Sequence, residues 1–302
     1  MTHKRLTMTV FIQKYVSFFF VLCILFSCSS KHQVKDLIQE GEQFLSENML
    51  DSAQRRFEMI CRLDSFNLKA LNHLGDIHFK KVEIGKSFRY FTRSIRADSI
   101  QPDVYLKLAE IKLMLGKYRE VFQTINKAFK INSQLPHGYF MKGVAYKHIG
   151  DTTKAISSFK TAIELRHDFS PVYYELGLLL TLKNDSLALP YYENGLRLTP
   201  NDVGLKASFA WALDQFNRPI QANKIYFETV RDFPNYMEVK SNYAVFKNKI
   251  GEIDTALILC NQLLNKAPRN EKILNLKGII LKRKGHFNEA QKIYDLLHGI
   301  NQ

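Results

Sequence analysis

Apolar residues in this chain recur at the spacing of one helical face. Tyr173, Leu176, Gly177 and Leu180, for example, stand at i, i+3, i+4 and i+7, which places them on one side of an α-helix. The pattern returns around eight small residues, spaced 34 residues apart in six intervals and 33 in one. These landmarks are Gly41, Gly75, Ala109, Gly143, Gly177, Ala210, Ala244 and Gly278. Such a fixed interval indicates tandem repeats.

A second amphipathic helix follows in each repeat. When the landmark is counted as position 8, a second set of residues occupies positions 20, 24 and 27, as in Ala155, Phe159 and Ala162. Their spacing of i, i+4 and i+7 is again helical. Each repeat is therefore predicted to be a hairpin of helix A and helix B. Small residues at positions 8 and 20 let the two backbones approach, and the residue at position 24 fills the gap beside them.

Turn-forming residues also keep this register. Position 15, where helix A must end, is glycine in four repeats: Gly116, Gly150, Gly251 and Gly285. Prolines stand between helix B and the next helix A, or open a helix, where a missing N–H costs nothing. One proline of eight, Pro190, falls inside a predicted helix B, in the repeat of 33 residues. We expect a kink or a late start of that helix.

The order of these residues resembles the tetratricopeptide repeat, whose units carry a Trp/Leu/Gly/Tyr set, then Ala/Phe/Ala, then Pro. The match is loosest in the third repeat, where Val121 and Ile125 replace the usual Ala and aromatic residue. The resemblance implies an all-α fold: a right-handed α-solenoid of about eight tandem helix hairpins, with a concave groove lined mainly by the A helices. It also implies that the protein binds a protein or peptide and performs no chemistry.

The chain is predicted to have three parts. Residues 1–27 are expected to be a signal peptide, residues 28–33 a short tether and residues 34–302 the repeat array. The predicted repeats span residues 34–67, 68–101, 102–135, 136–169, 170–202, 203–236, 237–270 and 271–302.

The leader has the composition of a bacterial lipoprotein signal. A basic start precedes an apolar run from Tyr15 to Phe26, which is too short to span a bilayer comfortably and has the length of a signal-peptide core. The sequence Leu25-Phe26-Ser27-Cys28 resembles the lipobox, so Cys28 is expected to carry a lipid, such as palmitate, that anchors the protein to a membrane. An ordinary secretory signal and an uncleaved anchor are the alternatives. Because Ser29 and not Asp follows Cys28, family analogy favours the outer membrane with the body in the periplasm, and surface exposure stays open.

No residue pattern indicates an enzyme. The nine histidines are scattered, and no Gly-rich phosphate loop, Gly-x-Ser-x-Gly motif or paired-cysteine zinc spacing occurs. Cys61 and Cys260 fall in the first and seventh repeats, too distant to form a disulfide. Cys260 occupies position 24, so we predict a packed thiol. We expect no catalytic residue, no metal and no cofactor.

The chain is basic, with a formal net charge of +14. Two clusters hold much of this charge: Lys80, Lys81, Lys86, Arg89, Arg93 and Arg96, and then Lys266, Arg269, Lys272, Lys277, Lys282, Arg283 and Lys284. Either these are solvated faces, or they dock to an acidic protein, anionic headgroups or an acidic wall polymer. An exported lipoprotein rarely meets nucleic acid, so we expect no nucleic-acid partner.

Positions 2, 5, 9 and 12 form a stripe about 130° around helix A from its buried face. In the fourth to sixth repeats this stripe carries Phe140, Val144, Tyr174, Leu178 and Trp211, and groove-facing positions of the last repeat carry Lys272, Lys282 and Arg283. Apolar groups on such a face predict an anchor site for a partner segment. The alternative is that they pack on the neighbouring helix A.

Together these features predict a lipid-anchored scaffold that recruits or assembles other proteins at the bacterial cell envelope. The alternative is a periplasmic carrier or sensor module that captures a peptide or a glycan fragment. The final helix B presents Ile293, Leu296 and Leu297 with no following repeat in this sequence, and from this we expect self-association or partner docking through that helix.

Overall fold

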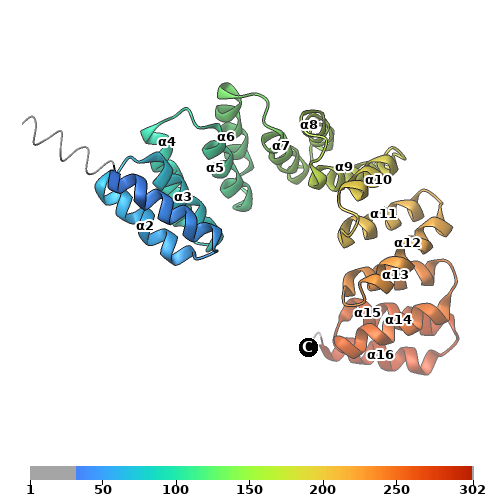
Figure 1. Cartoon of the computed structure of the whole chain (residues 1–302). Coiled ribbons are helices and arrows are strands. Elements are labelled where there is room, and N and C mark those ends of the chain that lie inside the picture. The colour runs from blue at the N-terminus through green and yellow to red at the C-terminus, as the bar shows by residue number, and fades with distance from the viewer. Residues whose placement is uncertain (1–31, 301–302) are drawn as a thin grey trace, which may run out of the picture. The chain divides into compact units, whose positions relative to one another are not determined.

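The structure is a computed structural model that describes residues 32–300. The predicted leader and Cys28 lie outside the described residues. Within residues 32–300 the chain forms helices and turns and no strand (Figure 1). This confirms the predicted all-α fold. None of these helices is both long and apolar enough to cross a bilayer.

Backbone contacts divide the chain into two compact units, with the boundary after Ala145. We call residues 32–145 the N-terminal unit and residues 146–300 the C-terminal unit. In the N-terminal unit a helix over residues 32–46 is followed by α2 (Leu50–Leu63), α3 (Leu68–Lys80), α4 (Ile84–Ala97), α5 (Pro102–Met114) and α6 (Tyr118–Ile131). Helix α7 (Pro136–His148) contains the boundary.

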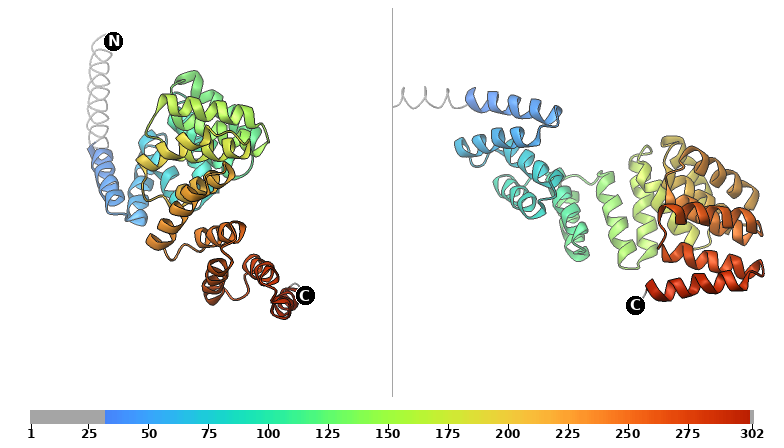
Figure 2. Two further views of the ribbon diagram at one scale, coloured as in Figure 1. Left: turned by 90° about the vertical axis from the view of Figure 1, so that its right-hand side faces the viewer. Right: turned by 90° about the horizontal axis from the view of Figure 1, so that it is seen from below.

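The C-terminal unit continues with alternating A and B helices (Figure 2). They are α8 (Thr152–Leu165), α9 (Ser170–Leu182), α10 (Ala188–Leu198), α11 (Val203–Gln215), α12 (Pro219–Asp232), α13 (Met237–Lys249), α14 (Ile253–Lys266), α15 (Glu271–Arg283) and α16 (Phe287–Ile300). Each helix A packs against the helix B that follows it, as in α9 with α10 and α13 with α14, and A helices also contact the next helix A, as in α9 with α11.

The core of each hairpin is the contact between positions 8 and 24. A Cβ placed on Gly75 would lie 2.5 Å from the ring of Phe91, and one on Gly177 would lie 2.9 Å from the ring of Tyr192. Atoms cannot approach so closely without movement, so at Gly75 and Gly177 the absence of a Cβ leaves the space that these rings occupy. The sixth repeat pairs a ring, Tyr226, with Ala210. Where position 24 is the smaller Ile125, in the third repeat, position 8 is Ala109.

Position 15 has a left-handed backbone in all eight repeats. The residues with positive φ are Asn48, Val82, Gly116, Gly150, Asn184, Asn217, Gly251 and Gly285. A left-handed residue after helix A ends the helix and reverses the chain. Glycine and asparagine adopt this conformation readily, whereas a β-branched residue is strained there. Val82, at φ 61° and 75 % exposed, is the one β-branched residue in this set.

The repeat of 33 residues has a short helix B. Helix α10 begins at Ala188 and has 11 residues, whereas the other B helices of the unit have 14. Pro190 is therefore the third residue of α10 and lies in its first turn, where backbone N–H groups have no partner within the helix. The predicted late start is confirmed.

The two cysteines of the described residues are free thiols. Cys260 is buried at position 24, as predicted, and burial raises the pKa of its thiol to about 11. Cys61 is half-buried, and burial raises its pKa also. A thiol with a raised pKa is mainly protonated at neutral pH and is therefore a weak nucleophile.

Candidate interaction site

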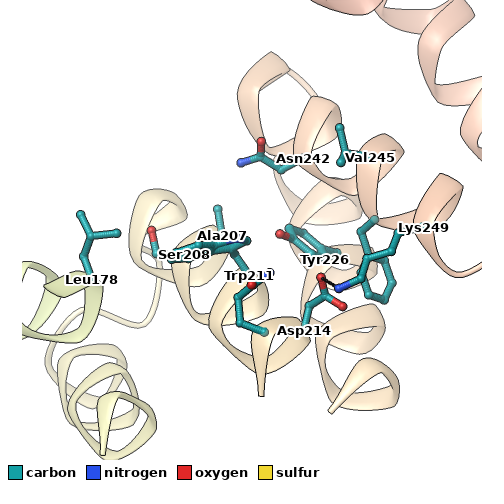
Figure 3. Close-up of a pocket in the computed structure, with 11 residues that line it drawn as sticks. Leu178, Ala207, Ser208, Trp211, Asp214, Tyr226, Asn242, Val245 and Lys249 are labelled. Carbon is teal, nitrogen blue, oxygen red and sulfur yellow. Dashed lines mark hydrogen bonds and ion pairs between the residues drawn. The ribbon is translucent and has the colours of Figure 1, made fainter. Parts of the chain in front are cut away.

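A hollow of about 660 Å³ lies on the C-terminal unit, along three successive A helices (Figure 3). Position 9 of α9, α11 and α13 contributes Leu178, Trp211 and Val245 to its lining. These three helices contact one another in order, α9 with α11 and α11 with α13. Stacking of the repeats thus brings one position of three separate hairpins into a continuous apolar surface.

Trp211 lies between the other two anchors. In Figure 3, Leu178 and Val245 lie on opposite sides of the segment of α11 that carries Ala207, Ser208 and Trp211. Leu178 and Trp211 are half-buried, and Val245 is 51 % exposed. Their exposed apolar surface is available to a partner. Burial of this surface on binding would stabilise a complex.

The far wall of the hollow is a rigid aromatic cluster. Tyr226 is buried, and its ring lies 5.6 Å from that of Tyr243 and 5.5 Å from that of Phe246, centroid to centroid. Burial raises the pKa of Tyr226 and the Asp214 carboxylate adds to this effect, so the phenol stays neutral at physiological pH. Tyr226 and Phe246 line the hollow beside Trp211 and Val245.

An ion pair closes the rim. Lys249 Nζ lies 2.7 Å from Asp214 Oδ2, linking the ends of α11 and α13. Asn242 and Ser208 supply further polar groups at the edge. Because the two charges neutralise each other, the hollow favours an apolar side chain flanked by groups that can hydrogen-bond.

The hollow has no arrangement for catalysis. It is lined by no histidine or cysteine, and its carboxylate is already paired with Lys249. Among residues 32–300 there is no cluster of three or more His, Cys, Asp or Glu side chains that could hold a metal ion. The geometry supports binding by contact.

The structure brings together two of the predicted groove residues, Leu178 and Trp211. Tyr174, one turn earlier on α9, is half-buried and does not line the hollow. Phe140 and Val144 belong to the N-terminal unit and are also half-buried, and Phe140 packs against a core cluster that contains Met141 and Ala145. Tyr174, Phe140 and Val144 are thus only partly covered by neighbouring residues.

The three predicted basic groove residues lie outside the hollow. Lys282 Nζ lies 4.8 Å above the ring centroid of Tyr294, on helix B of its own repeat. Arg283 donates a hydrogen bond of 2.6 Å to Asn248 Oδ1. Lys272 is exposed at the start of α15. Lys282 and Arg283 thus make local contacts, and the role of all three in partner binding stays a prediction.

Sequence reasoning missed Val245, Asn242 and the Asp214–Lys249 pair. Val245 could have been found, because it stands at position 9 of the seventh repeat, in register with Leu178 and Trp211. The ion pair could not, because it joins position 12 of one repeat to position 13 of the next, and no spacing within a single helix relates them.

A family model described as tetratricopeptide repeat matches residues 136–168. The stacked hairpins agree with this match over all described repeats. The chain thus has the tetratricopeptide-repeat fold, and residues 136–168 match the family. It is 24% identical over 196 residues to the TPR repeat-containing protein MJ1428 of Methanocaldococcus jannaschii, which covers 60% of this chain and 32% of that protein. It is 21% identical over 231 residues to Hsp70-Hsp90 organizing protein 3 of Arabidopsis thaliana, covering 73% and 40%. The alignments thus span less than half the length of these two relatives.

Solved structures share the fold of this tetratricopeptide-repeat protein. Pseudomonas aeruginosa pilF has a TM-score of 0.64 at 15% identity and covers 73% of this chain and 99% of its own. A tetratricopeptide repeat protein from Parabacteroides merdae has a TM-score of 0.61 at 14% identity and covers 83% and 99%. YrrB has a TM-score of 0.52 at 20% identity and covers 62% and 97%. At these identities the likeness concerns the fold alone.

Proposed function

We propose that this tetratricopeptide-repeat protein is a non-catalytic binding protein that holds a segment of a partner protein against the A helices of its C-terminal unit. The observation that carries this proposal is the row of position-9 side chains, Leu178, Trp211 and Val245, in one hollow. The size of the hollow suits one or two apolar side chains of a segment, and the repeat spacing allows further contacts along α15.

Related proteins support binding to peptides and proteins as the general activity. YrrB is described as having an unusual peptide-binding site, and several relatives are Hsp70-Hsp90 organising proteins. Those proteins' partners are not transferred to this chain. The residues that a chaperone-tail clamp requires at positions 5 and 9 of its first repeat, Lys and Asn, are here Ile38 and Glu42.

We further propose that the protein is a lipid-anchored scaffold at a bacterial cell envelope, held in the outer membrane and facing the periplasm. The leader supports this proposal through its apolar run and the lipobox-like sequence before Cys28. Labelling of cells with radioactive palmitate tests it. The full chain should incorporate label and a Cys28→Ser variant should not. An unlabelled full chain would remove the anchor from the proposal and leave the binding site intact.

Trp211 allows a direct test of the binding site, since it is the chain's only tryptophan. Peptides selected from a displayed random library should shift its fluorescence emission as they cover the indole. Val245→Asp should weaken this binding at least about tenfold, because it places a charge against an apolar ligand. Ile258→Asp on α14 is the matched control, since Ile258 is 56 % exposed, close to the 51 % of Val245. Equal loss in both variants would count against the hollow.

The size of the ligand distinguishes the proposed scaffold from the alternative, a carrier for a small peptide or glycan fragment. A photo-crosslinking amino acid at position 211 should form an adduct with a protein if the chain is a scaffold. A mass increase of only a few hundred daltons would support the carrier instead.

A further inference from the structure

One face of the N-terminal unit is strongly basic. It comprises positions 18, 22, 25, 26 and 29 of the B helices α2, α4 and α6, on the side opposite their buried positions 20, 24 and 27. Of these fifteen positions, eight carry Arg or Lys and two carry an acid, Asp51 and Glu58. The eight, which we call the basic face, are Arg55, Arg62, Arg89, Arg93, Arg96, Arg119, Lys127 and Lys130.

The charges of the basic face are exposed and are not neutralised by ion pairs among the described residues. All eight residues are exposed. No ion pair found between described residues includes a member of the basic face. Of the two acids, Asp51 pairs with Lys81, which lowers the pKa of Asp51, and Glu58 accepts a 2.7 Å hydrogen bond from Gln54 Nε2.

The equivalent positions of the C-terminal unit are balanced. Over α8, α10, α12, α14 and α16 they carry five basic residues and five acidic ones. These are Lys160, Arg197, Lys224, Arg231 and Lys292, and Glu164, Glu193, Glu228, Asp254 and Asp295. Interaction with the helix dipole explains cations at position 29, in the last turn. It does not explain those at positions 22 and 26, so the repeat fold itself does not require a basic face.

Exposed apolar side chains border the basic face where helix B ends. Phe66 and Ile100 occupy position 33 of the first and second repeats and are 69% and 72% exposed. Leu63 and Ile131, at position 30, are exposed as well. In the C-terminal unit, position 33 is polar or charged in all four repeats that have a following helix: Asp168, Asn201, Asn235 and Arg269.

We infer that the basic face, with Phe66 and Ile100 at its edge, is a docking surface for an anionic phospholipid bilayer. Basic side chains near an anionic leaflet attract it in proportion to their number. Large apolar side chains beside them insert at the boundary between headgroups and acyl chains. A soluble acidic polymer would use the charges alone, and the exposed Phe66 and Ile100 would then have no role.

The proposed lipid on Cys28 would bring this surface to the membrane, and to that extent the orientation of the protein rests on the proposed anchor. Cys28 precedes His32, the first described residue, by four residues. Four residues span at most about 14 Å when fully extended. The first repeat would therefore lie close to the headgroups, with α2 of the basic face in that repeat.

Sedimentation with lipid vesicles tests the inference without the anchor. A chain that begins at Ser29 keeps every described helix and carries neither leader nor lipid. It should bind vesicles of phosphatidylcholine with phosphatidylglycerol, and should not bind pure phosphatidylcholine. Binding should weaken when the salt concentration rises from about 50 mM to about 300 mM, because exposed charges are then screened.

Charge reversal should localise the contact. The triple variant Arg55→Glu, Arg89→Glu and Lys127→Glu changes one residue on each helix of the basic face and should bind anionic vesicles at least about tenfold more weakly. The control, Lys160→Glu, Lys224→Glu and Lys292→Glu, makes the same change in charge on three B helices of the C-terminal unit and should bind as the parent does. Circular dichroism verifies that both variants are folded. Equal binding by the two triple variants would overturn the inference.

A second variant separates a bilayer from an acidic polymer. Phe66→Ser with Ile100→Ser should weaken vesicle binding several-fold and leave retention on immobilised polyglutamate unchanged, because only a bilayer accepts the apolar side chains. Retention on polyglutamate with no binding to anionic vesicles would reassign the basic face to an acidic protein and refute the bilayer. If palmitate labelling fails while these vesicles bind, the anchor is wrong and the docking surface stands.

Discussion

The two units of this protein use one position of the repeat in opposite ways. At position 9 of helix A the first three repeats carry Glu42, Asp76 and Glu110, whereas the last four carry Leu178, Trp211, Val245 and Ile279. The fourth repeat, at the boundary of the two units, carries the apolar Val144. In the N-terminal unit two of these acids, Glu42 and Asp76, reach cations on the next helix A. Glu42 lies 2.7 Å from Lys69 Nζ and 3.4 Å from His73 Nε2, and Asp76 lies 3.4 Å from Lys107 Nζ. In the C-terminal unit the same position lines the apolar hollow.

Different positions of the repeat therefore serve folding and recognition. Positions 8, 20 and 24 are buried in both units and fix the hairpin. Position 9 lies away from the buried face and is only partly covered, so its chemistry can vary with little cost to the fold. One unit closes this surface with ion pairs, and the other leaves it apolar. The outer faces of the B helices differ in the same way, basic in one unit and balanced in the other.

The largest difference in stability between the two cores should appear at alkaline pH. Position 24 carries Phe57, Phe91 and Ile125 in the N-terminal unit, but Tyr192, Tyr226 and Cys260 among its residues in the C-terminal unit. Burial raises the pKa of Tyr192 to about 12. A group whose folded pKa is raised stabilises the fold fully below its unfolded pKa, near 10, and this contribution is lost as the pH rises to about 12.

For Tyr192 the loss corresponds to about 2.7 kcal/mol of the free energy of unfolding, since two pKa units are involved. Urea unfolding followed by circular dichroism at pH 8 and pH 11 should show about half of this loss, because pH 11 lies midway between the unfolded and folded pKa values. Tyr192→Phe should reduce the difference between the two pH values, and Tyr192→Phe with Tyr226→Phe should reduce it further. If the phenylalanine variants lose as much stability as the parent, the buried tyrosines are not the cause.

Overpacking at position 8 should cost about 1–3 kcal/mol in either unit. Gly75→Ala places a Cβ against the ring of Phe91, and Gly177→Ala places one against Tyr192. Adding Phe91→Ile to Gly75→Ala should recover part of the loss, because Ala and Ile are the natural pair in the third repeat. Urea unfolding midpoints give the comparison. Without recovery in the double variant, contact with the ring of Phe91 would not be what limits the side chain at position 75.

Release of strain at position 15 should stabilise the N-terminal unit by about 1 kcal/mol. Val82→Gly removes a β-branched side chain from a left-handed backbone at φ 61°. The reverse change, Gly251→Val, makes the matched test in the C-terminal unit and should destabilise it. Thermal unfolding measures both. A Val82→Gly variant that is less stable than the parent would show that the exposed valine makes a compensating contact.

The ion pairs at position 9 should matter least for stability. Glu42→Leu with Asp76→Leu should change the free energy of unfolding by less than about 1 kcal/mol, because the pairs are exposed and water screens them. Lys69 holds the pKa of Glu42 below its usual range, so the contribution of this pair should also fall as the pH drops through the pKa of Glu42. Unfolding at low and high salt measures the effect. A loss of several kcal/mol would mean that position 9 supports the fold, contrary to the comparison of the two units.

Much of the fold could be predicted because it depends on short-range patterns. The i, i+4 and i+7 spacing of Ala155, Phe159 and Ala162 is a property of one helix and needs no other part of the chain. Four left-handed turns could be located from glycine alone, whereas Val82 could not, because its own propensity argues against the conformation that the turn after helix A requires. The late start of α10 followed from Pro190 and the missing residue of that repeat.

Periodicity along the chain specifies the register of the repeats: which residues form helix A and helix B, which face is buried and where the chain turns. The tertiary structure decided which of the remaining residues meet. It placed Leu178, Trp211 and Val245 in one hollow, joined Asp214 to Lys249, and packed Phe140 against a core cluster instead of leaving it free. The physical reason is that periodicity arises within a single helix, whereas contact between residues about 34 positions apart depends on how successive hairpins stack.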